Sequence, residues 1–171
     1  DLPARSQFQF VEQEYMLADE YDELLKSPVD FVFDKLLPRI LGELGQKGSL
    51  RSYVAFLKGG MAQAAFGQAM RNRGARLQNE CGMPQPMAGF FLAPFDALGD
   101  SMRGLTGVLM DCFRQPDKVV AACDVLAYEM ANLALATADP LKRYPIFVPT
   151  HKPTFMSPDQ FDKFFWPSFK K

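Results

Sequence analysis

Tyr144-Pro-Ile-Phe-Val-Pro-Thr-His-Lys-Pro-Thr-Phe-Met-Ser-Pro-Asp-Gln-Phe-Asp-Lys-Phe-Phe-Trp-Pro167 is the stretch of sequence that decides the predicted fold. Its apolar run 146–148 lies between two prolines and is too short for a helix, so it predicts a buried strand. Further on, Ser157 stands where a helix N-cap is expected, with Pro158 at the first helical position. The stretch therefore predicts a strand, a loop and a helix start, and the loop holds the chain's single histidine, His151.

This loop supplies the first candidate site residues. In α/β folds, the segment that leaves the C-terminal end of a buried parallel strand carries the functional groups. His151 is predicted to be catalytic, because imidazole exchanges a proton near neutral pH and can also bind a metal. The alternative is a structural or solvent-exposed histidine. Lys152 is a candidate for binding an anionic substrate, although a solvated lysine is the more frequent case.

A second apolar run, Met87-Ala-Gly-Phe-Phe-Leu-Ala93, predicts another buried strand, which ends at Pro94. Three polar side chains follow it closely. We expect Asp100 to be catalytic, and Asp96 and Arg103 to bind substrate. The alternative for these three residues is an Asp–Arg ion pair that fixes the loop.

The segments around the two strands carry helical periodicity and cap signals. Residues 1–13 have no strong period and predict an extended arm. Helices are predicted over residues 14–26, from 28 onward with a kink at Pro38, over 50–80 with a weak point at Gly59-Gly60, irregularly over 94–114, and over 116–138. Two strands joined by a long helix predict a parallel βαβ unit. We therefore expect a single domain, residues 1–171, in which 1–88 is mostly helical and 89–171 is the βαβ part.

Composition excludes several classes of protein. The 171 residues are 48% hydrophobic with a net charge of −1, so no basic field indicates a nucleic-acid partner. The sequence offers no apolar run near the roughly 18 residues of a membrane span and no signal peptide, which predicts no membrane association. Three cysteines without a CxxC pair argue against a disulfide framework or structural zinc and fit a cytoplasmic protein. Cys112 and Cys123 are predicted to be buried apolar residues rather than nucleophiles.

Several segments resemble the uroporphyrinogen decarboxylase superfamily, which includes corrinoid-dependent and coenzyme M methyltransferases. In order, they are Gly89-Phe-Phe-Leu-Ala-Pro-Phe95, Arg103-Gly104, Pro116-Asp-Lys-Val119, and Met156-Ser-Pro158 with Phe161, Phe164 and Pro167. The match covers residues 89–171, and the first 88 residues match only loosely. The resemblance implies the central part of a (β/α)8 TIM barrel, helix-rich and with few strands in this chain. It also implies that catalytic groups lie outside these residues, including an arginine-rich loop and a His-x-Cys zinc motif.

Two positions depart from the decarboxylase pattern. Asp100 stands where those enzymes have a tyrosine that faces the substrate, and His151 stands near the place of a serine. Both departures favour the corrinoid-linked methyltransferase or uncharacterised branch over a porphyrinogen decarboxylase, because a carboxylate repels a polycarboxylated tetrapyrrole. The resemblance implies a small-molecule, tetrapyrrole or corrinoid substrate. We also expect a homodimer or a corrinoid-protein partner. A corrinoid or zinc is expected only in the full-length protein, and no metal ligand is assigned in this chain.

Two further hypotheses remain open. The chain is either a non-catalytic helical module that binds a partner protein through exposed Phe and Met side chains, or a fragment that is inactive on its own. Juxtaposition of His151, Asp96 and Asp100 beside two parallel strands would favour the enzyme.

Overall fold

The computed structural model describes residues 13–171, so the arm predicted for residues 1–13 lies almost wholly outside it. The described residues are mainly helical. Helices are α1 (Tyr21–Lys26), α2 (Pro28–Phe31), α3 (Leu37–Ile40), α4 (Leu50–Cys81), α5 (Pro94–Leu98), α6 (Gly104–Arg114), α7 (Pro116–Thr137), α8 (Pro158–Gln160) and α9 (Trp166–Phe169). Wider π-helical turns cover Val32–Leu36, Gly99–Arg103 and Phe161–Phe165, and 3-10 turns cover Gly42–Leu44 and Lys152–Phe155. The strands are β1 (Gly89–Phe90) and β2 (Ile146–Phe147).

Side-chain caps fix three of the helix starts, including the start at Ser157 that the sequence predicts. Ser157 forms a capping box, in which its hydroxyl accepts from the Gln160 N–H at 3.3 Å and Gln160 Oε1 accepts from the Ser157 N–H at 3.0 Å. Ser49 accepts from the Ser52 N–H at 3.1 Å at the start of α4, and Ser27 caps α2. These signals are local, so the sequence alone is enough to place them.

The strands pair in parallel, with Gly89 opposite Ile146 and Phe90 opposite Phe147, as the βαβ prediction requires. The predicted partial (β/α)8 barrel is nevertheless wrong. Among residues 13–171 the sheet contains only these two strands of two residues each, and the protein is helical. Pro145 and Pro149 bound β2 and lack the N–H that a longer ladder needs. Phe90 and Phe147 are also about half exposed, so neither is the buried strand residue of a barrel.

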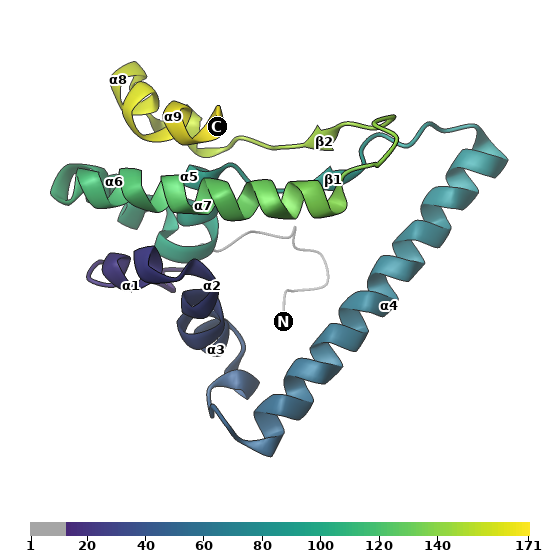
Figure 1. The fold of residues 1–171 in the computed structure, drawn as a ribbon, viewed down its shortest axis with the longest axis horizontal. Coiled ribbons are helices and arrows are strands. Elements are labelled where there is room, and N and C mark those ends of the chain that lie inside the picture. Colours follow the sequence, from purple (N-terminus) through teal and green to yellow (C-terminus); the bar gives the residue numbers. More distant parts are fainter. Residues whose placement is uncertain (1–12) are drawn as a thin grey trace, which may run out of the picture.

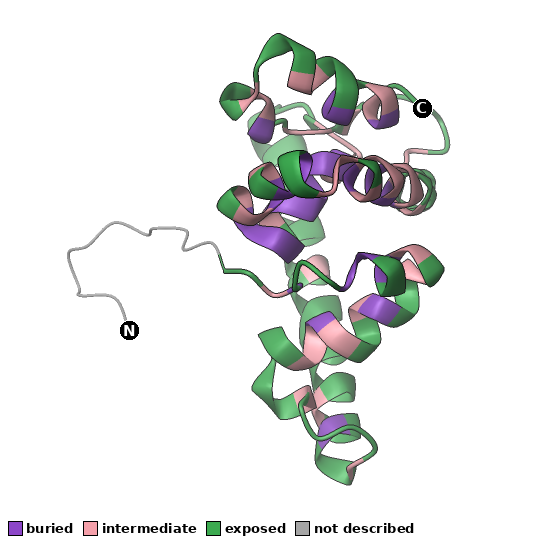
Figure 2. Cartoon of the chain, turned by 90° about the vertical axis from the view of Figure 1, so that its left-hand side faces the viewer, coloured by how far each residue is buried: buried purple, intermediate pink, exposed green. Residues whose placement is uncertain are grey.

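The core lies around the first half of α7. Val119, Ala122, Cys123 and Leu126 form one buried face of this helix, at the spacing that the sequence predicts, and Cys112 on α6 is buried as well. α7 packs against α1, α5, α6 and α9, which brings both ends of the described chain onto one helix. In Figure 2 the buried positions gather in the helices stacked around α7. The second half of α7 is more exposed than the first, with Leu133 at 48%.

α7 also bears on the membrane prediction. It is 22 residues long and contains an 18-residue window with a mean hydropathy of 1.5, so by length and composition alone it could cross a membrane. The expectation that no apolar run is long enough is therefore incorrect for this helix. In this structure one face of the helix is buried in the core, and 28% of the apolar window is buried.

α4 stands apart from the other helices (Figure 1). Gly59 and Gly60 do not break it, and it ends at Gly82, whose φ of 67° is the left-handed conformation of a helix C-cap. Along its 32 residues only Ser52 is buried, close to the contact with the Gly42–Leu44 turn. The helix therefore links the α1–α3 region to the sheet while leaving most of its surface open.

Candidate functional site

The predicted loop after β2 is fixed by Asp96, the third residue of α5. Its side chain is fully buried and accepts the backbone N–H of Lys152 at 2.7 Å and that of His151 at 3.2 Å. Burial raises the pKa of the Asp96 carboxyl, while the two N–H donors act in the opposite direction. Asp96 thus orients the loop backbone, and its role here is positional.

Asp100 connects the two residues of the loop that carry polar chemistry. One carboxylate oxygen lies 2.7 Å from Lys152 Nζ, and the other lies 3.3 Å from His151 Nδ1. The Lys152 side chain is only 4% exposed, so the expectation that this lysine is solvated is wrong. A buried ammonium requires an anionic partner, and Asp100 meets that requirement.

A glycine allows this arrangement. A Cβ added at Gly99 would lie 3.0 Å from Lys152 Cε and 3.4 Å from Lys152 Cγ, so the lysine stem passes directly over the Gly99 backbone. Gly99 and Asp100 belong to the same π-helical turn, Gly99–Arg103. The turn therefore supplies both the space for Lys152 and its counterion.

His151 and Asp100 border a cavity of about 580 Å³. The other lining residues are Gln13, Tyr15, Ile40, Leu92 and Ser101. The His151 side chain is 57% exposed, and that of Asp100 is 16% exposed. The volume suits a small organic molecule, and the lining combines an apolar wall with a few polar groups, as ligand sites commonly do.

The Arg103 side chain does not line this cavity. It is 4% exposed, and its guanidinium bonds Asp111 at 2.6 Å, the carbonyl of Met16 at 2.5 Å, and Glu14. The Tyr21 hydroxyl donates to the same Asp111 oxygen at 2.9 Å, and its burial beside Asp111 raises its pKa. The ion pair offered as the alternative for Arg103 exists, but its partners are Asp111 and Glu14 rather than Asp96 or Asp100.

Three side chains of this region lie close enough together to bind a metal ion. Asp96, Asp100 and His151 each offer one ligand atom, all within 4.8 Å of one another, which is close enough to share an ion. Lys152 already supplies a positive charge to Asp100, so an ion there would compete with a buried ammonium. The arrangement fits proton transfer better than metal binding.

The sequence does not show that the five candidate residues have different structural roles. Four of the five meet at one place, where Asp96 orients, Lys152 neutralises, and Asp100 and His151 face the cavity. Sequence reasoning also missed Tyr15 and Ile40, which reach the cavity from the N-terminal region. No local pattern marks these two residues, because their approach depends on long-range packing.

No protein-family model matches this chain, and neither does any curated protein or solved structure. The resemblance to the uroporphyrinogen decarboxylase superfamily therefore stays a prediction from the quoted segments.

Proposed function

We propose that Asp100 and His151 form the proton-transfer pair of an enzyme that acts on a small methylated compound in the 580 Å³ cavity. The observation that carries this proposal is the contact of His151 Nδ1 with Asp100 at the edge of that cavity. An ionised carboxylate can only accept a hydrogen bond, so Nδ1 donates and Nε2 is the basic nitrogen. A histidine oriented in this way is a general acid and base.

Charge supports the choice of substrate. With His151 neutral, the two carboxylates Asp96 and Asp100 and the ammonium of Lys152 leave one negative charge when all are ionised. A polycarboxylated tetrapyrrole is disfavoured beside that charge, whereas a neutral or cationic methylated compound is not. This agrees with the methyltransferase or uncharacterised branch that the resemblance implies.

The proposed chemical role of His151 is to protonate the atom that loses the methyl group. A corrinoid, when present, supplies the methyl acceptor. The cavity has the size of a small-molecule site, so a corrinoid would be presented at its opening by a separate protein. For this step His151 first takes up a second proton on Nε2 from solvent, passes it to the departing alkoxide or amide anion, and returns to its neutral form; without that proton both are poor leaving groups.

The test combines binding with turnover. Because the chain has one histidine, its imidazole NMR signals are assigned without ambiguity. A panel of methyl ethers and methylamines is titrated against them, and compounds that shift the signals are assayed for demethylation with a corrinoid protein. We expect His151→Gln to reduce turnover by about 10²–10⁴-fold, and Asp100→Asn to reduce it less.

A matched control is Asp124→Asn, which removes a carboxylate from an exposed pair with Lys171. It should leave turnover unchanged. A His151→Gln protein that demethylates within a few-fold of wild type would overturn the proposal.

A non-catalytic interaction module is the second candidate. The exposed apolar side chains of α4 favour it. It predicts that no compound of the panel shifts the His151 signals, whereas the enzyme predicts that at least one does.

A further inference from the structure

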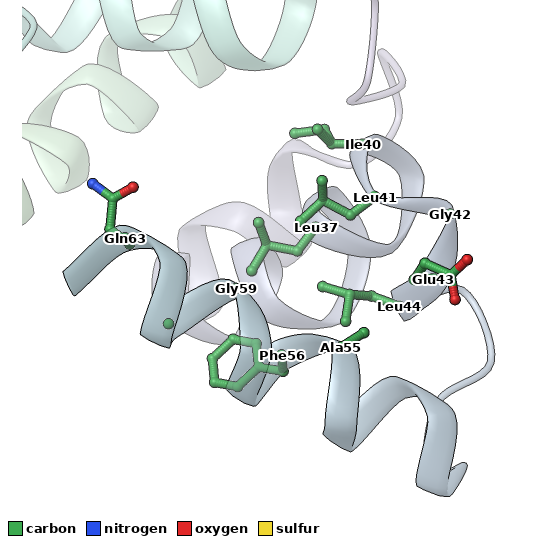
Figure 3. A pocket seen from close by; sticks show the side chains of 11 residues that line it. Leu37, Ile40, Leu41, Gly42, Glu43, Leu44, Ala55, Phe56, Gly59 and Gln63 are labelled. Carbon is green, nitrogen blue, oxygen red and sulfur yellow. The ribbon is translucent and has the colours of Figure 1, made fainter. Parts of the chain in front are cut away.

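α4 borders an apolar groove that no other described segment fills. The groove has a volume of about 720 Å³ and lies between α4 and the segment formed by α3 and the Gly42–Leu44 turn. Figure 3 shows Leu37, Leu41 and Leu44 facing Phe56 across it. On the α4 side, Gly59 and Gly60 also line the groove, and a Cβ added at either glycine would have nothing within 4 Å.

The groove continues into a stripe along α4. Large side chains recur every seven residues at Phe56, Gln63, Met70 and Leu77. Four residues after each of them comes a small one, at Gly60, Gly67, Gly74 and Cys81. Spacings of four and three residues place all eight on one side of a helix. Phe56, Met70 and Leu77 are 52%, 49% and 47% exposed. Phe56 meets the edge of Phe33, and residues 83–86 border Gly74 and Leu77, but much of this face stays open within residues 13–171.

The pattern is complementary to itself. When two such helices run antiparallel about a two-fold axis between residues 68 and 69, each small residue meets a large one. The opposed pairs are Gly60 with Leu77, Gly67 with Met70, Gly74 with Gln63, and Cys81 with Phe56. A two-fold interface requires this reciprocity, in which residue i meets j and j meets i. Gly60 lines the groove, so the Leu77 side chain of the second copy would enter it.

We propose that the groove and this face of α4 bind α4 of a second copy of the chain, giving an antiparallel homodimer. The exposed apolar area is large enough for a stable dimer interface. Ile40, Leu41, Phe56, Met70 and Leu77 are 42–52% exposed. At ~180 Å² for a fully exposed large side chain, they offer about 430 Å² of apolar area per copy. Since interfaces are a little over half apolar, the whole contact covers about 770 Å² per copy, which is close to the roughly 800 Å² of a typical stable complex.

The first test measures mass in solution for the full chain at micromolar concentrations by light scattering. We expect wild type at twice the 19.2 kDa of one chain, and Met70→Glu at the single-chain mass. Met61→Glu is the matched control, because Met61 lies nine residues away on the opposite side of the helix and is 72% exposed. It should remain dimeric. A monomeric wild type, or loss of the dimer in both variants, would overturn the proposal, and a monomer would leave the face to a different protein.

The second test fixes the register and does not rely on a disruptive substitution. In a Cys81→Ser background, Gln63→Cys with Gly74→Cys should give a disulfide-linked dimer on mild oxidation. The two positions are about 16 Å apart along one helix, too far for a bond within one chain. Ala62→Cys with Ala75→Cys has the same opposed numbering but points away from the stripe, and should not cross-link. Equal cross-linking of both pairs would contradict the antiparallel seam.

Discussion

Glu20 and Arg39 form a close ion pair on the N-terminal side of the core. Arg39 donates to the two Glu20 oxygens at 2.7 and 2.6 Å, and the Glu20 side chain is 8% exposed. The hydrogen bonds from Arg39 lower the pKa of Glu20 from 4.5 to about 2. A carboxyl with a depressed pKa stabilises the folded state above its unfolded pKa, and this contribution is lost as the pH falls through the folded value.

We therefore expect stability to fall between pH 4.5 and 2, by at most about 3 kcal/mol from this residue. Urea unfolding of wild type and Glu20→Gln across this range measures it, because the variant should lack that part of the pH dependence. Asp34→Asn, at an exposed pair with Lys47, is the control and should follow wild type. Parallel curves for wild type and Glu20→Gln would refute the assignment.

The three cysteines differ in reactivity. Burial raises the pKa of the Cys112 thiol to about 12 and raises that of Cys123 as well, while Cys81 is exposed. Thiolate is the reactive form, so at concentrations low enough to keep the chain monomeric a thiol reagent should modify one cysteine in the native chain and three after unfolding. Cys81→Ser should leave none reactive in the native state. Rapid native labelling of Cys112 or Cys123 would show that the core opens easily.

β1 lies close to the C-terminal end of α7. A Cβ at Gly89 would lie 2.5 Å from Thr137 Oγ1 and 3.0 Å from Thr137 Cβ, at the end of α7. Gly89→Ala should therefore destabilise the fold by about 1–3 kcal/mol, since the strand or helix end must move. Gly59→Ala is the opposite case, because nothing lies within 4 Å and alanine favours the helix by about 1 kcal/mol. Thermal unfolding of both variants should show opposite signs, and equal shifts would contradict this packing.

Element starts could be predicted from the sequence because their causes are local. Ser157 with Gln160, and Ser49 with Ser52, are separated by three residues and cap their helices whatever surrounds them. The length of a strand is different, because it depends on neighbours that continue the ladder. Apolar runs flanked by prolines therefore predicted the parallel pairing but overstated its extent.

The candidate site shows the same division between local and distant causes. Both aspartates and the His151–Lys152 loop could be identified because they follow predicted strands. The burial of Lys152 could not, since it depends on Gly99 and Asp100, more than fifty residues earlier in the chain. Arg103 was placed with the wrong partners for a similar reason, because its carboxylates come from α6 and from the segment before α1.

At the scale of the whole molecule, the barrel prediction failed because two parallel strands are compatible with many architectures. Closing a barrel requires eight strands that each pair on both sides. Here α7 organises the core instead, by packing with helices from both ends of the described chain, while the sheet stays a minor element beside it. Figure 1 shows this arrangement, with α4 as the one long helix outside the stack.

The glycines inside α4 also make this helix easier to unfold locally. Gly59, Gly60, Gly67 and Gly74 lie inside the helix, and each costs about 1 kcal/mol relative to alanine. With little tertiary packing to offset this cost, α4 should unfold locally long before α7, and its amide hydrogens should exchange with solvent much faster. Because a second copy binds only the folded helix, raising the protein concentration should slow that exchange in α4 and leave α7 unchanged. The fraction of molecules in which α4 is folded then increases with the protein concentration.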